Sequence, residues 1–315
     1  MPPEIQDSSK TYKDSFNKFP CNRFSIISAI TIILILLFFI FPGTIDRGLS
    51  LQAESPISIA PGDVSQGELV KIELKEEVPG GEVVFAGESY SLHTYNGNGT
   101  ALIPVSYWLE PGEYTLSIFS ADGTPIDKLS LSVTEGNFSE SFIEVDEEME
   151  EQIDPEAPEK QKRRERDREL VYEARSDSSE DRLWQKSFRW PLEGRITTEF
   201  GATRYHNGEL ANRHNGIDIA APQGTPVKST NRGRVVLARD LLATGKTVII
   251  DHGWNVFSSY LHFSELKASK GDMVEKGDVI GLVGETGFAT GPHLHWSMSV
   301  KRVFVDPEDF LELDI

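Results

Sequence analysis

One uncharged apolar run near the start of the chain limits what the rest of the chain can be. Residues 24–41, FSIISAITIILILLFFIF, contain no charged side chain, and their polar side chains are Ser25, Ser28 and Thr31. As a helix the run would be about 27 Å long, close to the roughly 30 Å thickness of the hydrocarbon core of a bilayer. A helix buried in a soluble core is rarely so uniformly apolar, so we interpret the run as a transmembrane anchor.

The residues that flank this run favour an uncleaved anchor over a cleaved signal peptide. A signal peptide has a shorter apolar region and ends at a small-residue cleavage site, whereas the exit here is PGTIDRG. Basic residues precede the run more often than they closely follow it: Lys10, Lys13, Lys18 and Arg23 against Arg47. This bias predicts a single-pass protein of the cytoplasmic (inner) membrane, with residues 1–23 in the cytoplasm and the C-terminal domains outside, in the periplasm or the cell-wall space.

Composition and charge argue against several classes of function. The chain of 315 residues has room for about two domains. Its 31 basic and 50 acidic residues give a net charge of -19, which argues against a nucleic-acid partner because such partners bind basic surfaces. The single cysteine, Cys21, precedes the apolar run. The sequence therefore predicts neither an intramolecular disulfide nor a cysteine metal cluster.

Residues 51–136 predict a small antiparallel β-sandwich of immunoglobulin-like style. Runs in which apolar and polar residues alternate, such as ELVKIEL and EYTLSIFS, are separated by the turn signals VPGG, NGNGT, EPGE and ADGTP. Closely spaced strands with tight turns are typical of such sandwiches. His93 is the one histidine of this region, and we interpret it as a surface or core residue.

Residues 137–185 predict a charged, partly helical linker. An acidic run at 140–151 contains little apolar material and is followed by EKQKRRERDRELVYEARS, a stretch of good helix formers. Opposite charges three residues apart, such as Glu165 and Arg168, would support a solvated helix. The basic cluster in that stretch could also be a nucleic-acid or lipid patch, but its acidic neighbours favour a spacer.

Residues 186–310 predict a β-rich domain that holds most of the histidines. GIDIA, GRVVLAR, KTVIIDH, VFSSYLH, DVIGLVG and HLHWSMSV are typical of strands. Six of the seven histidines of the chain fall in this domain: His206, His214, His252, His262, His293 and His295. This crowding favours a metal or acid–base site over scattered use in a core.

Two motifs place ionisable side chains on strands. In HNGIDIA, Asn-Gly is a turn dipeptide and Asp218 alternates with isoleucines, so His214 is expected on a loop that enters the strand carrying Asp218. A carboxylate between isoleucines is costly to bury unless it is paired or bound to a metal. In TGPHLHWSM, His293 and His295 would share one strand face.

The residues alone leave the roles of these side chains open. His293 and His295 could be two ligands of one metal, two catalytic bases, or one of each. His262, in SSYLHFSEL, would share a strand face with Tyr260, and taken by itself it is more simply structural. Three ligands of the His and Asp type with an open fourth position are typical of a catalytic zinc site, where further imidazoles move protons or stabilise an oxyanion.

Six segments of the C-terminal domain occur together and in order: HNGIDIAAPQGTPV, GRVVLA, TVIIDHG, SSYLHFS, GDMVEKGDVIGLVGETG and TGPHLHW. With them, the stretch from 190 to 306 resembles the M23 (lysostaphin/LytM-type) zinc endopeptidases, which cut peptide bonds in bacterial peptidoglycan. Each segment alone is weakly specific, whereas their combination is highly specific. The resemblance covers more than a third of the chain.

The resemblance implies one zinc ion per peptidase domain, bound by His214, Asp218 and His295. It also implies a non-ligand pair, His262 and His293, that acts on the water and the tetrahedral intermediate. The implied activity is hydrolysis of peptidoglycan peptides in cell-wall remodelling, here from a membrane anchor. An activator protein, or a partner in the division or elongation machinery, would suit such an enzyme.

The alternative function is a catalytically silent or autoinhibited module that binds the wall or regulates another hydrolase. In that case the loop at 202–213 or the linker would occlude the site. Some members of the family lack one or more of the five site residues, whereas this sequence keeps all five, which favours an active enzyme. The resemblance also implies that His252, in DHG, is structural.

Overall fold

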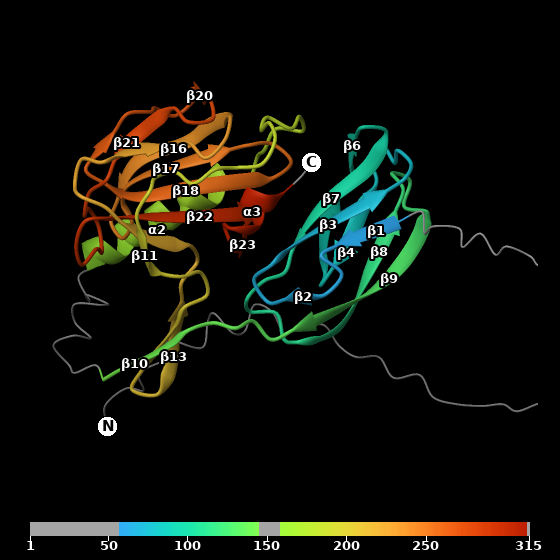
Figure 1. Cartoon of the computed structure of the whole chain (residues 1–315), viewed down its shortest axis with the longest axis horizontal. Helices are drawn as coiled ribbons and strands as arrows, with labels where there is room; N and C mark the ends of the chain where they lie inside the picture. Colours follow the sequence, from blue (N-terminus) through green and yellow to red (C-terminus); the bar gives the residue numbers. More distant parts are fainter. Residues whose placement is uncertain (1–56, 145–157, 314–315) are drawn as a thin grey trace, which may run out of the picture. The chain divides into compact units, whose positions relative to one another are not determined.

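A computed structural model describes residues 57–144 and 158–313 of the chain (Figure 1). All of them belong to the second of the chain's two compact units, Ala53–Ile315. In these two ranges no helix is long and apolar enough to cross a membrane. The expected anchor at 24–41 lies outside the described residues and stays a prediction.

Residues 57–134 form the N-terminal β module, whose two sheets have the strand orders β1-β3-β7-β6 and β2-β9-β8-β4-β5. Its strands are β1 (Ile57–Ala60), β2 (Val64–Ser65), β3 (Leu69–Leu74), β4 (Glu82–Phe85), β5 (Glu88–Ser91), β6 (His93–Tyr95), β7 (Asn98–Pro104), β8 (Gly112–Phe119) and β9 (Pro125–Thr134). Alternation selects the side chains that reach the core: in β3, Val70, Ile72 and Leu74 are buried, while the lysine and the glutamate between them are half-buried.

The pairing of this module departs from the expected antiparallel pattern at one place among its described strands. Val64 of β2 lies opposite Val133 of β9 in a parallel pair. β1 belongs to the other sheet, and the chain crosses from it to β2 within three residues. β2 then runs beside β9 in the same direction. The immunoglobulin-like style of the module stays a prediction.

The C-terminal domain is built on a sheet of eight described strands, with the order β11-β14-β22-β18-β17-β16-β20 and with β23 beside β22. In Figure 1, β16, β17, β18 and β22 lie side by side. The strands are β11 (Arg195–Thr198), β14 (Ile217–Ala220), β16 (Gly233–Leu241), β17 (Gly245–Asp251), β18 (Val256–Phe263), β20 (Met273–Val274), β22 (His293–Val300) and β23 (Val303–Val305).

Nearly every residue of β17 and β22 is buried, because both faces of the large sheet are covered. A smaller sheet follows the order β15-β21-β19. Its strands are β15 (Pro226–Lys228), β19 (Glu265–Leu266) and β21 (Val279–Leu282), and the short helix α3 (Asp309–Glu312) lies near the end of the described chain. The prediction of a mainly β chain is confirmed.

Helix α2 (Pro158–Ala174) packs against the large sheet instead of standing free in solvent. Asp167 is buried, and its Oδ2 accepts a hydrogen bond from the backbone N of Leu242 at 2.7 Å. A few apolar side chains at helical spacing suffice to dock this highly charged helix, so the expectation of a solvated spacer is wrong for it. The docking side chains are Leu170, Val171 and Ala174.

The segment between α2 and residue 188 also packs into the C-terminal domain. Trp184 is 1% exposed, and its ring meets that of Trp254 edge-on at 5.2 Å between centroids. The backbone N of Leu183 donates to the carbonyl oxygen of His252 at 2.8 Å. The packing of the domain therefore begins upstream of residue 186, the boundary expected from the sequence.

The segment RYHNGELAN, expected as a loop, is a β-hairpin. β12 (Thr203–His206) and β13 (Glu209–Arg213) pair antiparallel around Asn207 and Gly208, which both have positive φ. Asn-Gly is the dipeptide that such tight hairpin turns favour. β10 (Glu140–Ile143), from the charged segment, adds to β12 as a parallel third strand.

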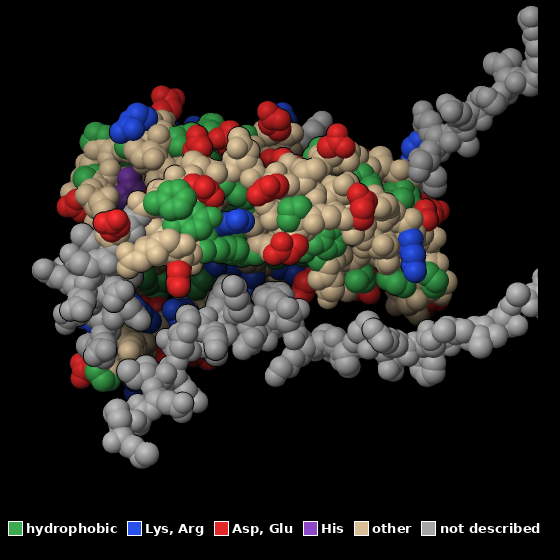
Figure 2. All heavy atoms as spheres, turned by 90° about the horizontal axis from the view of Figure 1, so that it is seen from below, with side chains coloured by type: hydrophobic (Ala, Val, Ile, Leu, Met, Phe, Trp, Pro, Cys, Tyr) green, Lys and Arg blue, Asp and Glu red, His purple; other side chains and the backbone are tan. Residues whose placement is uncertain are grey.

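The surface shows the acidic balance of the sequence. On the face in Figure 2, acidic side chains are spread among neutral ones over the coloured surface. This distribution is in keeping with the net charge of -19.

We predict that Trp184→Ala lowers the free energy of unfolding by about 3–5 kcal/mol, because it leaves a cavity where the segment after α2 packs into the C-terminal domain. Chemical denaturation of the purified protein measures this. The matched control is Tyr172→Ala on the exposed side of α2, where the side chain is 56% exposed and the expected loss is about 1 kcal/mol or less. Equal losses in the two variants would contradict the docking of this segment.

Candidate metal centre

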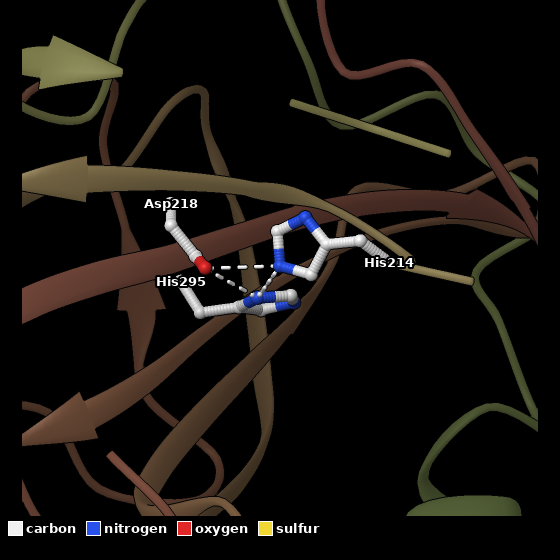
Figure 3. A group of neighbouring side chains, drawn as sticks. All are labelled: His214, Asp218 and His295. Carbon is white, nitrogen blue, oxygen red and sulfur yellow. Dashed lines mark hydrogen bonds and ion pairs between the residues drawn. The ribbon is translucent and has the colours of Figure 1, made fainter. Parts of the chain in front are cut away.

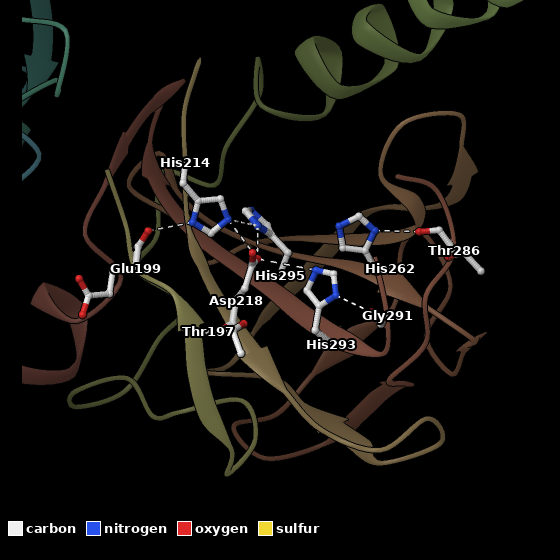
Figure 4. Close-up of polar contacts among 9 residues, drawn as sticks. All are labelled: Thr197, Glu199, His214, Asp218, His262, Thr286, Gly291, His293 and His295. Carbon is white, nitrogen blue, oxygen red and sulfur yellow. Dashed lines mark hydrogen bonds and ion pairs between the residues drawn. The ribbon is translucent and has the colours of Figure 1, made fainter. Parts of the chain in front are cut away.

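Strand pairing in the large sheet brings a carboxylate and two imidazoles together. β14 pairs with β22 so that Asp218 lies opposite His295 and Ala220 lies opposite His293. Residues directly opposite each other point to one face, and residues two apart on a strand share a face. The register therefore places the three ionisable side chains on the same face of the sheet (Figure 4).

His214 reaches this face from the turn before β14. Its backbone N donates to the carbonyl oxygen of Ala202 at 2.9 Å, and its carbonyl oxygen accepts from the N of Gly201 at 2.8 Å. The turn runs so close to β22 that a Cβ atom on Gly216 would lie 2.4 Å from the carbonyl oxygen of Trp296. Only glycine lets the turn lie against the strand at this point.

Three donor atoms converge in front of the sheet (Figure 3). His214 Nε2 lies 3.0 Å from Asp218 Oδ1 and 3.0 Å from His295 Nδ1, and the latter two atoms are 2.9 Å apart. We call these residues the metal trio. Within the described parts of the chain, the trio is the one group of His, Cys, Asp or Glu side chains placed closely enough to share a metal ion.

The hydrogen bonding of the trio fits a bound cation. His214 Nδ1 donates to the carbonyl oxygen of Glu199 at 2.9 Å, so in the neutral ring the lone pair of Nε2 faces the trio. A carboxylate and two imidazole nitrogens this close repel one another unless a proton or a cation lies among them. Two histidines and one carboxylate form a known ligand set of catalytic zinc sites, which keep a fourth position open.

Burial and hydrogen bonding set the charges of the trio. Burial lowers the pKa of His295, while its hydrogen bond with Asp218 acts in the opposite direction. Burial also opposes ionisation of Asp218, but its close polar contacts with His214 and His295 outweigh it and hold the pKa of Asp218 well below its usual range. An ionised carboxylate beside a neutral imidazole is the protonation state that metal binding requires.

Two further imidazoles lie beside the trio, each oriented by a backbone carbonyl (Figure 4). His262 Nδ1 donates to Thr286 O at 2.7 Å, and His293 Nδ1 donates to Gly291 O at 2.8 Å. In its neutral form, each ring would therefore carry its lone pair on Nε2. The two ring centroids are 4.8 Å apart, and His293 Nε2 lies 3.9 Å from Asp218 Oδ1.

A β-bulge brings His262 to this site. Simple alternation predicts His262 on the face of Tyr260, which pairs with Trp296 on the side away from His295. The register of β17 and β18 shifts beside His262, whose φ is 64°. The expected face is wrong because the bulge inserts an extra residue into β18.

Burial sets the protonation state of His262. Burial lowers its pKa to about 4, although the hydrogen bond to the carbonyl of Thr286 acts in the opposite direction. The ring is therefore neutral at pH 7, and its positive φ is a strained backbone state of the kind found at functional positions. A neutral imidazole beside the metal donors can take a proton from water.

Sequence reasoning missed the carbonyl groups that orient the histidines, those of Glu199, Thr286 and Gly291. Every residue has a carbonyl, so no side-chain pattern marks these positions. The one available signal was the glycine-rich run GETGFATGP, whose backbone supplies two of the three.

Two histidines serve other parts of the molecule. His252 is fully buried; its Nδ1 donates to Arg232 O at 2.8 Å, and its Nε2 accepts from Ser258 Oγ at 2.7 Å. It is structural, as the sequence motif implied. His93 stacks on the ring of Trp254 with 4.4 Å between centroids, so it joins the N-terminal β module to the C-terminal domain.

Residues 212–307 match the model of peptidase family M23. The C-terminal domain belongs to this family. Its resemblance to the family, inferred from the sequence motifs, is therefore confirmed. The M23 domain carries the trio and the two neighbouring imidazoles within the matched range.

Curated relatives match this chain over a little more than a third of its length. The chain is 39% identical over 128 residues to the peptidoglycan DD-endopeptidase ShyA of Vibrio cholerae, which covers 40% of this chain and 30% of ShyA. It is 38% identical over 113 residues to the DD-carboxypeptidase/endopeptidase Mpg of Neisseria meningitidis, which covers 36% of this chain and 26% of Mpg. The chain thus spans less than a third of the length of either relative.

One solved structure is similar over more than the M23 domain. It is the crystal structure of a Pseudomonas aeruginosa protein described as an M23 peptidase, with 29% identity and a TM-score of 0.63. The likeness covers 78% of this chain and 94% of that chain, so it extends into the N-terminal β module.

We predict that His252 stays neutral well below pH 6.5. Burial lowers its pKa from 6.5 to about 4, and the hydrogen bond with Arg232 only partly opposes this. The unfolded chain takes up this proton near pH 6.5, so the stability that His252 contributes is complete above pH 6.5 and is lost as the pH falls towards 4. Histidine-selective NMR titration of the folded protein measures the pKa, and a midpoint near 6.5 would contradict the prediction.

Proposed function

We propose that this chain is a membrane-anchored zinc endopeptidase that hydrolyses peptide bonds in bacterial peptidoglycan. The observation that carries the proposal is the convergence of the trio's donors at 2.9–3.0 Å with two oriented imidazoles beside them. The curated relatives named as peptidoglycan endopeptidases support this class of substrate. Their DD designation favours DD-type bonds of the stem peptides as the bonds that are cut.

The three residues of the trio would hold the zinc ion: His214, Asp218 and His295. Zinc bound there would supply a Lewis acid that polarises the scissile carbonyl and lowers the pKa of water. The trio has no cysteine, and its two imidazoles and one carboxylate suit a catalytic rather than a structural ion.

The pair His262 and His293 would carry the proton transfers. One Nε2 would accept a proton from the attacking water and pass it to the leaving amine, and the other ring, when protonated on Nε2, would donate a hydrogen bond to the oxyanion of the tetrahedral intermediate. The carbonyls of Thr286 and Gly291 keep both rings aimed at the site. Holding the rings in place saves the entropy of orienting them during each turnover.

The anchor at 24–41 is the second part of the proposal. The apolar length of the run and the basic residues before it support a single crossing of the cytoplasmic membrane with the M23 domain outside. An enzyme tethered in this way would remodel the wall near the membrane, within reach of the anchor. A fusion reporter after residue 42 that stays in the cytoplasm would contradict this orientation.

Digestion of purified peptidoglycan by the whole protein tests the activity. We predict new peptide fragments and free amino termini in the products, loss of both after chelation, and recovery on adding zinc. Product analysis by mass spectrometry also identifies the bond. Intact peptidoglycan after incubation with folded, zinc-loaded protein would contradict the enzyme and favour the silent, wall-binding alternative.

Two alanine substitutions separate metal binding from proton transfer. His295→Ala should lose zinc and activity together, because it removes one of three donors. His293→Ala should keep zinc but lose about 10²–10⁴-fold in rate, the usual contribution of a general acid or base. His206→Ala removes an imidazole outside the trio and should keep zinc. Full activity in both of the first two variants would contradict the assignment of roles.

A further inference from the structure

The N-terminal β module contacts the strand that delivers His214. The contact centres on Arg213, the last residue of β13 and the neighbour of His214 in the chain. Its Nη1 donates a hydrogen bond to the carbonyl oxygen of Tyr107. Its guanidinium lies 4.9 Å from the centre of the Trp108 ring. Tyr107 and Trp108 both belong to the loop between β7 and β8 of the N-terminal module.

Phe138 completes this contact. Its ring centre lies 5.3 Å from the guanidinium of Arg213. The ring fills a space bordered by glycines of three segments: a Cβ atom on Gly67, Gly136 or Gly201 would lie 3.3, 2.4 or 2.0 Å from a carbon of the ring. Gly67 is in the N-terminal module, and Gly201 is in the loop before β12. The Phe138 ring thus packs between the loop before β12 and the N-terminal β module.

The guanidinium of Arg213 is held tightly at this junction. Its Nε is buried and has no hydrogen-bond partner within the described ranges. One hydrogen bond and two aromatic rings therefore account for its placement. A planar, weakly hydrated guanidinium tolerates such surroundings far better than the ammonium group of lysine does.

The placement of Arg213 bears directly on His214. The backbone of His214 is hydrogen-bonded to Gly201 and Ala202, and its ring is hydrogen-bonded to Glu199. His214 therefore moves with this loop, which rests on the N-terminal module. The other two donors of the trio come from paired strands of the large sheet. The distances within the trio thus depend on the junction around Arg213.

We propose that Arg213 is a positioning residue for the metal trio and that the N-terminal β module holds it there through Tyr107 and Trp108. The inference rests on the proposed function, since it concerns the same zinc donors. It assigns the module a role within the enzyme: by fixing where the imidazole of His214 lies, the module sets the zinc affinity of the site. Arg213 acts through His214.

The zinc dissociation constant of Arg213→Ala in the full chain tests the proposal. Competition against a chelator of known affinity should show binding weakened by about tenfold or more, as for other residues that orient metal ligands. Arg204→Ala, an exposed arginine of the same hairpin, is the matched control and should bind zinc like the wild type. Arg213→Lys keeps a hydrogen-bond donor but not the planar stacking, so its affinity should be intermediate.

A second pair of variants approaches the junction from the other side. Trp108→Ala alters only the N-terminal module and should also weaken zinc binding. Ile126→Ala, in the same module, is its matched control, because the two side chains are similarly exposed, at 43% and 38%. This pair tests whether the N-terminal β module affects zinc binding even if Arg213→Ala does not fold. Thermal unfolding of each variant, recorded in parallel, separates a loss of fold from a loss of metal.

The absorption spectrum of the cobalt-substituted protein gives a further readout, because it reports ligand geometry. We expect it to change in Arg213→Ala and Trp108→Ala and not in their controls. Zinc affinities and spectra indistinguishable from those of the controls would overturn the proposal. Wild-type protein that binds zinc but cleaves nothing would contradict the proposed function alone, whereas wild-type protein that binds no zinc at the trio would contradict both.

Discussion

The register of β14 against β22 is the constraint on which the candidate metal centre depends. It sets Asp218 opposite His295, and a slip of one residue would turn Asp218 into the core and expose its neighbours. Those neighbours, Ile217 and Ile219, are only 2% and 1% exposed, so burial of apolar surface holds the register. Packing of the hydrophobic core therefore fixes the relative positions of the donor atoms. Asp218 faces the site and not the core, so its carboxylate does not disturb the packing of the sheet.

The proposed division of labour among the histidines rests on which ring nitrogen faces the site and how far it lies from Asp218. His214 and His295 approach Asp218 Oδ1 at 3.0 and 2.9 Å, whereas Nε2 of His293 is 3.9 Å away. Rings at hydrogen-bond distance can share a cation with the carboxylate, and a ring further out can act on what the cation binds. Backbone carbonyls enforce the choice of nitrogen in three rings: His214, His262 and His293.

Short-range patterns made much of this site predictable. Alternation in HNGIDIA predicted that Asp218 points away from the isoleucines beside it, and alternation in TGPHLHWSM predicted that His293 and His295 share a strand face. The pairing of β14 with β22 then brings these side chains together. His262 was placed on the wrong face because its bulge depends on the register in which β17 and β18 pair, which the alternation within β18 does not encode. The docking of α2 was missed because its apolar stripe is short within a charged stretch. The junction around Arg213 escaped notice because it joins segments far apart in the chain.

The central claim is that a zinc ion is bound by the trio. Anomalous diffraction at the zinc edge, from crystals of the zinc-loaded protein, tests it most directly. We expect one strong peak about 2.0–2.2 Å from each of His214 Nε2, Asp218 Oδ1 and His295 Nδ1, with His262 and His293 outside bonding distance. A peak that lacks any of the three donors, or a crystal of zinc-loaded protein with the metal elsewhere, would contradict it.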